Sequence, residues 1–261
     1  MIKLKCPVCA GELNLYDGFA ACKNSHRFDR AASGYLNLLL SQKKHAKDPG
    51  DSRDMVLARR RFLDAGYYAP LRDAIVLKLK ELKPKSILDA GSGEGYYTSE
   101  FSKIADTVGI DLSKDAILRA SKRDKTGLYC VGSIFDLPVF DNSVDVVTSI
   151  FAPYSAEEFS RVTNTVIAVI PGEKHLFGLK EALYEKPYLN DEKGYELPGF
   201  DLVDKVSVDF DIEVVGSDAI FDLFSMTPYF WRTPRDATEK LAKTEKLNTP
   251  ISFRILTYKK R

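Results

Sequence analysis

The spacing of hydrophobic and polar residues predicts alternating strands and helices through the middle of the chain. Short apolar runs there have the length and the β-branched content of buried strands. They cover 86–90, 107–111, 128–131, 144–151 and 165–170. Between them we expect helices at 96–104, 114–122 and 155–162. This alternation predicts an α/β fold in which helices cover both faces of a parallel sheet.

The flanking segments extend this fold over residues 54–261. Two helices are expected before the first strand, at 53–65 and 70–82, and apolar residues recur on one face of the second. Two long strands, 204–214 and 250–258, enclose helical material near the C-terminus. Together these elements predict a seven-stranded, Rossmann-like domain.

The first 53 residues have a different character. Residues 1–40 are too few to bury a core of their own and need a covalent or metal staple. Residues 41–53 are polar and are broken by Pro49-Gly50, so they are expected to form a linker. We therefore expect a small module at 1–40, a linker at 41–53 and one large domain at 54–261.

Three of the four cysteines lie in the first 22 residues, and a histidine follows them. The four residues have the spacing Cys-x2-Cys, then twelve residues, then Cys-x3-His; they are Cys6, Cys9, Cys22 and His26. Thiolates and an imidazole at such spacings close a tetrahedral Zn²⁺ site with no open position, which makes the metal structural. A disulfide framework is the alternative, and a reducing compartment argues against it. The Cys6-Pro7-Val8-Cys9 knuckle and the Asp17-Gly18 turn predict a zinc ribbon.

Charge is distributed unevenly along a chain whose net charge is only +1. Residues 1–61 carry a net charge of +6 and the remaining residues a net charge of −5. A basic N-terminal segment on an acidic body suggests contact with a polyanion, although solvated faces alone would give the same count. No secretory leader follows Met1, and no apolar run approaches the roughly 20 residues that cross a bilayer. We therefore expect a cytoplasmic protein with no membrane partner.

A glycine-rich turn follows the first strand of the large domain. The sequence Asp89-Ala90-Gly91-Ser92-Gly93-Glu94-Gly95 leads from a strand into a helix, and Asp111 ends the next strand. In open α/β sheets a ligand lies beside this turn, and a carboxylate at the position of Asp111 can accept hydrogen bonds from both ribose hydroxyls.

Two cofactors compete for this turn. A dinucleotide fingerprint reads G-x-G-x-x-G, but its third glycine position is Tyr96 here, and glycine comes one residue early at Gly95. S-adenosylmethionine has a ribose and an adenine but no phosphate, so it does not need a pyrophosphate cradle. The spacing therefore favours S-adenosylmethionine, with a dinucleotide or an unoccupied turn as alternatives.

At this point the chain resembles the RlmA-type 23S rRNA (guanine-N1)-methyltransferases, nearly from end to end. The shared motifs are the CPVC…C…H knuckles, RFDRAASGYLNLL, DPGDSRDMVLARRRFLDAGYYAPLRDAI, ILDAGSGEGYYT, PGEKHL and MTPYFWR. The resemblance implies a Rossmann-like, S-adenosylmethionine-dependent methyltransferase sheet behind an N-terminal zinc-ribbon module. It also implies methylation of guanine N1 in a 23S rRNA hairpin loop. Family members are often dimers, so a homodimer is a further implication for which the residues carry no signal.

The resemblance assigns roles residue by residue. It matches Cys6, Cys9, Cys22 and His26 to the zinc ligands of the family. It matches Gly93 and Glu94 to cofactor-loop contacts, Tyr68 to a tyrosine that touches the cofactor, and His175 to a histidine near it. With the residues of the glycine turn, the expected cofactor-binding set is Tyr68, Asp89, Gly91, Gly93, Glu94, Asp111 and His175. Many methyltransferases place an acid after the third strand, where this chain has Ser133.

Candidates on the acceptor side follow the fourth strand. Phe151 or Tyr154 can stack on an extruded base, or Phe151 can simply pack while Pro153 turns the chain. Guanine N1 must lose a proton, so His175 is either a cofactor contact, a base, or only a cap. The aromatic run 228–231 either lines the acceptor pocket or packs on the sheet. No catalytic residue is assigned on these grounds.

Three functions remain open from the sequence. The first is an rRNA guanine-N1 methyltransferase in which the zinc module positions the RNA. The second is a small-molecule methyltransferase with a purely structural zinc module. The third is a zinc-dependent nucleic-acid binder without activity, against which the intact Asp89, Gly91, Gly93 and Asp111 argue.

Overall fold

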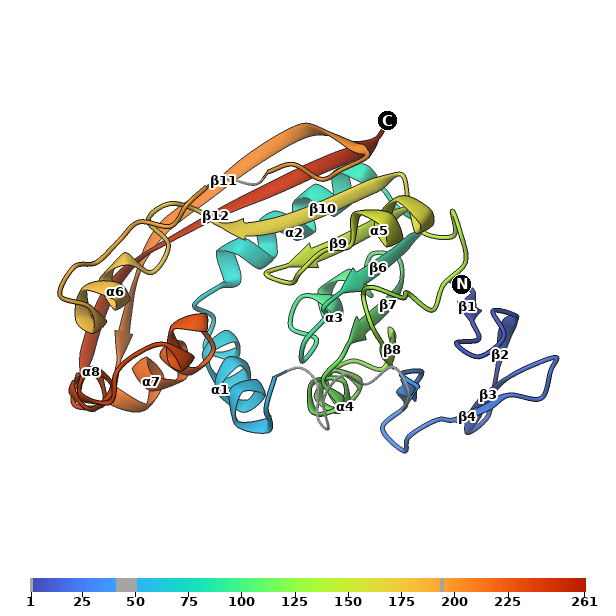
Figure 1. Cartoon of the computed structure of the whole chain (residues 1–261), viewed down its shortest axis with the longest axis horizontal. Helices are drawn as coiled ribbons and strands as arrows, with labels where there is room; N and C mark the ends of the chain where they lie inside the picture. Colours follow the sequence, from blue (N-terminus) through green and yellow to red (C-terminus); the bar gives the residue numbers. More distant parts are fainter. Residues whose placement is uncertain (1, 41–50, 193–194) are drawn as a thin grey trace.

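The computed structural model describes residues 2–40, 51–192 and 195–261. Its centre is a sheet with the strand order β11-β12-β10-β9-β6-β7-β8-β5 (Figure 1). Five of these strands run parallel in the order 3-2-1-4-5 and bring their carboxyl ends to one edge. They are β6 (Ser86–Ala90), β7 (Asp106–Asp111), β8 (Leu128–Val131), β9 (Val146–Ile150) and β10 (Thr165–Pro171). This half of a doubly wound sheet confirms the predicted α/β class, and its switch point lies between β6 and β9.

Helices surround the parallel strands. The described helices before β10 are α1 (Arg53–Asp64), α2 (Ala69–Leu82), α3 (Thr98–Phe101), α4 (Lys114–Arg123) and α5 (Ala156–Val162). The helix α4 shows why the sequence folds this way locally: Ser113 caps it by accepting a hydrogen bond from the N–H of Ala116. Asp115 lies in its first turn and Arg123 in its last, which suits the helix dipole. The helix predicted at 96–104 is much shorter, because turns occupy residues on both sides of Thr98–Phe101.

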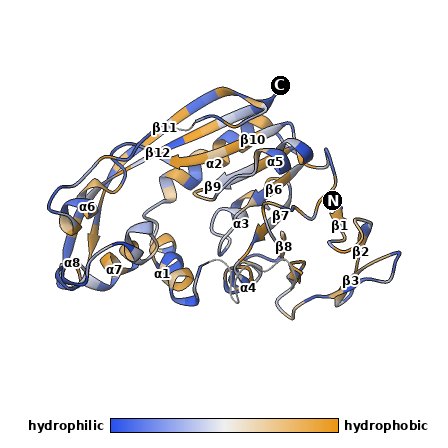
Figure 2. Cartoon of the chain, in the orientation of Figure 1, coloured by the Kyte–Doolittle hydropathy of each residue, from blue (hydrophilic) through white to orange (hydrophobic). Residues whose placement is uncertain are grey.

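An antiparallel hairpin completes one side of the sheet. The strands β11 (Phe200–Val215) and β12 (Lys246–Lys260) are longer than predicted, and β12 lies between β10 and β11. Between them come α7 (Ser217–Ser225), the 3-10 helix η2 (Pro228–Trp231) and α8 (Arg235–Leu241), while α6 (Phe177–Leu183) follows β10. Figure 2 shows β10 as a nearly continuous hydrophobic strand, whereas the colours alternate along β11. That difference is expected between a strand buried on both faces and an edge strand.

The N-terminal residues form a second, four-stranded antiparallel sheet. Its strands are β1 (Leu4–Lys5), β2 (Glu12–Tyr16), β3 (Phe19–Cys22) and β4 (Arg27–Asp29). Gly18 takes a positive φ of 80° in the predicted Asp17-Gly18 turn. The next strand, β5 (Leu36–Asn37), joins the large sheet parallel to β8, so the described large sheet has eight strands rather than the predicted seven. Two residues are too few for a periodic pattern to reveal.

The small sheet packs directly on the large one. Leu4, Leu13 and Ala20 belong to the same hydrophobic cluster as Leu88 and Val108 from β6 and β7. The N–H of Lys5 donates to the carbonyl of Pro138 at 2.8 Å. The N-terminal module is therefore held against the loop after β8. Residues 41–50 of the predicted linker lie outside the described residues. In the described part of the chain, no helix has both the length and the apolar character needed to cross a membrane.

Candidate metal centre and cofactor site

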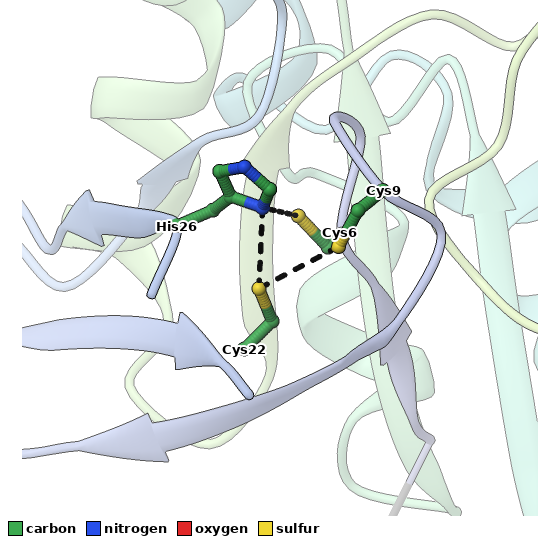
Figure 3. A group of neighbouring side chains, drawn as sticks. All are labelled: Cys6, Cys9, Cys22 and His26. Carbon is green, nitrogen blue, oxygen red and sulfur yellow. Dashed lines mark hydrogen bonds between the residues drawn. The ribbon is translucent and has the colours of Figure 1, made fainter. Parts of the chain in front are cut away.

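The four predicted metal ligands converge in the N-terminal module (Figure 3). Their ligand atoms all lie within 4.8 Å of one another. The Nδ1 atom of His26 is 3.3 Å from the Sγ atom of Cys22 and 3.6 Å from that of Cys6, and the Sγ atoms of Cys9 and Cys22 are 3.6 Å apart. Ligand atoms bound tetrahedrally to Zn²⁺ lie about 3.5–3.8 Å apart. The cluster therefore has the donors and the size of a closed structural zinc site.

Two turns present these ligands. In the first, the N–H of Ala10 donates to the carbonyl of Cys6, and Ala10 has a positive φ of 59°. In the second, the N–H of Ser25 donates to the carbonyl of Cys22, and Ser25 has a φ of 63°. A hydrogen bond from the backbone of Gly11 lowers the pKa of the Cys9 thiol to about 6, which favours the thiolate that a metal requires.

The glycine turn lies at the carboxyl edge of the sheet. Gly91 has a φ of 85°, and a Cβ atom there would come within 2.4 Å of the Cβ of Ala152, so only glycine fits between this turn and the loop after β9. Gly93 has a φ of 56° and would meet nothing within 4 Å, so the turn is open at that point. The turn therefore offers backbone at an open surface, as a cofactor without phosphate requires.

Two predicted carboxylates take different places around the turn. Asp111 accepts hydrogen bonds from the N–H groups of Gly93 (2.9 Å) and Ser113 (2.8 Å), one on each oxygen. Burial raises the pKa of Asp111 against these two hydrogen bonds. Asp89 lies deeper and accepts from the hydroxyls of Thr98 and Thr148, and burial raises its pKa to about 6. Asp111 is thus oriented for a ligand, whereas Asp89 links β6 to α3 and β9.

Glu94 points inward rather than to the open side of the turn. Its side chain is only 2% exposed and pairs with Arg123 of α4 at 3.0 Å. Arg123 in turn pairs with Asp64 of α1 at 2.7 Å. Burial raises the pKa of Glu94 and outweighs the attraction of Arg123. In the geometry of this structure, Glu94 ties the glycine turn to two helices beneath it.

Three other predicted residues form one aromatic cluster. Tyr68 meets the ring of Phe253 edge-on at 5.0 Å, and Phe151 and His175 lie 5.1 and 4.5 Å from the same ring. Phe151 has left β9 with a positive φ of 55° and is half-exposed. The structure thus brings Tyr68, Phe151 and His175 together at the ends of β9 and β10. Phe253, on β12, was not predicted, because nothing in the sequence indicates which strand pairs with β10.

Hydrogen bonds fix the protonation of His175. The N–H of Ser252 donates to its Nδ1 atom at 3.4 Å, so the ring proton lies on Nε2, which is 3.4 Å from the hydroxyl of Tyr68. Burial, reinforced by the charge of Lys180, lowers the pKa of His175 to about 3. A neutral imidazole whose one lone pair already accepts a hydrogen bond is a poor base. His175 is therefore suited to positioning Tyr68 rather than to removing a proton.

A buried lysine lies next to this cluster and was not predicted from the sequence. Lys180 of α6 is fully buried and donates to the carbonyl of Tyr188 (2.9 Å) and to the Oδ1 atom of Asn190 (2.6 Å). Among the described residues no carboxylate pairs with it, and burial lowers its pKa. The Nδ2 group of Asn190 donates to the carbonyls of Gly172 and His175. This network fixes the segment that carries His175, yet a helical lysine has no sequence signal that separates it from a surface residue.

Other candidate residues lie apart from the aromatic cluster. The hydroxyl of Tyr154 donates to the carbonyl of Glu196, and its ring is exposed. The hydroxyl of Ser133 accepts from the N–H of Phe135 within its own loop. Asp51 and Arg59 pair beside Asp111, and the carbonyl of Asp51 accepts from the hydroxyl of Ser113 at 3.0 Å. The segment that starts at Asp51 therefore reaches the cofactor edge.

Known proteins that are similar to this chain identify the family in which the metal cluster and the glycine turn occur together. Residues 4–47 match the family model described as the N-terminal part of RlmA, and residues 88–170 match the methyltransferase domain. A 23S rRNA (guanine(748)-N(1))-methyltransferase of Streptomyces fradiae is 33% identical over 69% of this chain and 67% of its own length. A Bacillus subtilis relative with the name "Putative 23S rRNA (guanine-N(1)-)-methyltransferase YxjB" is 29% identical over 97% of this chain and 95% of its own length.

The sheet, the glycine turn and the metal cluster thus define an S-adenosylmethionine-dependent methyltransferase with an N-terminal zinc ribbon. More narrowly, the chain belongs to the RlmA-type 23S rRNA (guanine-N1)-methyltransferase family. Its cofactor is S-adenosylmethionine, and its metal is a structural zinc ion. The predicted class, family and cofactors are confirmed, whereas the individual cofactor contacts stay predictions.

Proposed function

We propose that this protein methylates N1 of a guanine in a hairpin loop of 23S rRNA and that its zinc ribbon positions the RNA. The observation that carries this proposal is the shared core between the ribbon and the cofactor sheet. A ribbon packed on the loop after β8 has a fixed place relative to the cofactor edge, as a substrate-positioning device requires.

The residues of the cofactor edge have distinct tasks in this proposal. Bound S-adenosylmethionine would supply a methyl group on an activated sulfonium. Asp111, held by Gly93 and Ser113, would accept from the ribose hydroxyls. The open backbone at Gly93 would lie against the cofactor, and Tyr68, whose oxygen faces the Nε2–H of His175, would offer its own proton. Glu94 and Asp89 would support the turn from below.

The acceptor nitrogen needs no protein nucleophile, but it must lose its proton. The N1–H bond breaks as the N1–carbon bond forms, and the negative charge that develops on the ring needs stabilisation. His175 is a poor base for the reasons given above. The positive charge of Lys180, which already acts on the pKa of His175, would favour an anionic guanine on this side of the sheet, with the proton released to water. Positioning supplies most of the rate enhancement in such a displacement.

The zinc ribbon offers a surface that suits unpaired RNA. Tyr16 is 51% exposed and stacks on Phe19, with 4.9 Å between the ring centroids. The guanidinium of Arg27 lies 3.9 Å from the centroid of Phe19. We call Tyr16, Phe19 and Arg27 the ribbon platform. Aromatic rings beside an arginine bind single-stranded bases by stacking and phosphates by charge.

Methyl transfer to defined RNA tests this proposal. The protein is incubated with labelled S-adenosylmethionine and an unmodified 23S rRNA fragment, and the modified base is mapped by nuclease digestion and mass spectrometry. N1-methylguanine in a hairpin loop is expected, and it also stops reverse transcription because the methyl group blocks the pairing edge. Label that appears only on small molecules would support the alternative, a small-molecule methyltransferase with a purely structural ribbon.

Two further expectations depend on the family rather than on the geometry. An rRNA substrate places the enzyme where ribosomes are, in the cytoplasm. A homodimer is expected from the family resemblance, and sedimentation of the zinc-loaded protein tests it: a species of twice the mass of the chain is expected, and a monomer at all concentrations would contradict it.

A further inference from the structure

The most exposed of the large hydrophobic side chains in the described structure is that of Trp231, which is 70% exposed. It ends the 3-10 helix η2, which comes between α7 and α8 in the chain. Figure 1 shows these two helices at the end of the molecule opposite the zinc ribbon. Phe230 meets it edge-on at 5.2 Å, and Phe230 itself packs on Phe221 and Phe224 of α7 at 6.3 and 5.4 Å. The indole is therefore presented outward on an ordered aromatic support.

Hydrogen bonds link this turn to the cofactor edge. The hydroxyl of Tyr229 donates to the Oδ1 atom of Asn190 at 3.4 Å, and the Nδ2 group of Asn190 donates to the carbonyl of His175 at 3.1 Å. Tyr229, two residues before Trp231, is thus connected through Asn190 to the segment that carries His175.

Two arginines follow the indole in the chain, and two acids, Asp236 and Glu239, come after them. Arg232 follows it, is exposed and, within the described structure, forms no ion pair. Arg235 is also exposed and pairs with Glu239 of its own helix. An outward-facing indole beside unpaired guanidinium charge suits a partner that combines a flat aromatic face with a negative backbone. An unpaired nucleotide has both, since its base presents a flat face to the indole and its phosphate can pair with the guanidinium.

We propose that Trp231 is a stacking platform for one unpaired nucleobase of the RNA hairpin loop and that Arg232 contacts a phosphate beside that base. Trp231, Phe230 and Arg232 are called the tryptophan platform below. This proposal rests on the proposed function, since it assumes that the substrate is a loop of RNA. It adds a second RNA contact on the side of the cofactor edge away from the zinc ribbon.

The chain contains a single tryptophan, so intrinsic fluorescence reports on this residue alone. The zinc-loaded protein is titrated with the 23S rRNA hairpin in the presence of S-adenosylhomocysteine, and with a blunt duplex of equal length that has no loop. Stacking is expected to quench at least half of the fluorescence with the hairpin and to leave it nearly unchanged with the duplex. Saturable hairpin binding with unchanged fluorescence overturns the platform and leaves the proposed function intact.

Variants separate stacking from folding. Trp231→Ala should weaken hairpin binding about 10-fold, the scale of one lost stacked base, and Trp231→Phe only about 2-fold to 3-fold. Binding of S-adenosylmethionine, measured by calorimetry, should stay within 2-fold in both. Leu77→Ala, which truncates an exposed side chain of α2, is the matched control and should change neither. Wild-type affinity in Trp231→Ala overturns the proposal, and a wild-type protein that binds no hairpin overturns both it and the proposed function.

Discussion

The two ends of this molecule reach similar surfaces by different means. At one end the zinc ribbon carries Tyr16 on Phe19 beside Arg27, and at the other η2 carries Trp231 on Phe230 beside Arg232 (Figure 1). The ribbon is held by four metal ligands and short strands. The second surface is held by ring packing and by the Asn190 hydrogen bonds. A small module needs a metal to fix an exposed aromatic ring, whereas a larger subdomain can do so with ordinary packing.

The cofactor edge lies between these two ends in the strand order. The ribbon packs beside β8, and the C-terminal helices follow β10 and β11, so the glycine turn after β6 is flanked on both sides. A hairpin loop held at both platforms would have its target base over the carboxyl ends of the parallel strands.

Removal of a zinc ligand should have the largest effect. Cys22→Ser should lose zinc, and its rate of RNA methylation should fall about 100-fold or more, because structural zinc contributes folding energy that a small module cannot replace. Binding of S-adenosylmethionine should stay within about 3-fold, since the cofactor edge has its own hydrogen bonds. Metal analysis, calorimetry and the methylation assay measure the three quantities.

The fourth cysteine provides the matched control for this change. Cys130 lies in β8, is fully buried and is not one of the four clustered ligands. Cys130→Ala should keep zinc and methylation. Methylation that survives in zinc-free Cys22→Ser would show that the ribbon does not hold the RNA.

Asn190→Ala alters the other end. The change removes one of the two acceptors of buried Lys180 and leaves the carbonyls of Gly172 and His175 without the Asn190 donor, so the free energy of unfolding should fall by about 2–3 kcal/mol. Urea unfolding measures this loss. Zinc content should be unaffected, and Asn248→Ala, at an exposed position of β12, should unfold like the wild type. An equally stable Asn190→Ala would mean that the network does not hold this end together.

Stability should depend on pH through His175. In the unfolded chain the imidazole takes up a proton near pH 6.5, but in the folded protein it does so only near pH 3. The neutral His175 therefore makes its full contribution to the free energy of unfolding above pH 6.5, and this contribution is lost as the pH falls toward 3. Relative to His175→Gln, the wild type should lose about 1.4 kcal/mol for each pH unit between pH 6 and pH 4. Parallel stability curves for the two proteins would show that His175 titrates normally.

Substitutions in the ribbon platform should have the smallest effect on RNA binding. Tyr16→Ala should weaken binding of the hairpin about 5-fold, because an RNA base loses the half-exposed ring on which it stacks. Tyr16→Phe keeps a ring and should bind like the wild type. Filter binding at fixed salt measures the affinities. Unchanged affinity in Tyr16→Ala would leave the tryptophan platform as the principal aromatic contact.

The zinc ligands, the parallel strands and the glycine turn could be predicted because each depends on local spacing. Cys6, Cys9, Cys22 and His26 converge as expected, and β6 and β8 have the predicted bounds. The inward direction of Glu94 and the burial of Lys180 could not be predicted, because partners distant in the sequence, Arg123 and Asn190, determine them. The same holds for β5 and Phe253, whose places depend on pairing with β8 and β10.

The central claim is that one RNA hairpin lies across both platforms with the cofactor edge between them. Ultraviolet crosslinking of the zinc-loaded protein to the 23S rRNA hairpin, with S-adenosylhomocysteine bound, tests it when the crosslinked peptides are identified by mass spectrometry. Crosslinks to the β2–β3 segment that contains Tyr16 and to the segment that contains Trp231 are expected in the same complex. Crosslinks confined to one end, under conditions in which the hairpin is methylated, would contradict the claim.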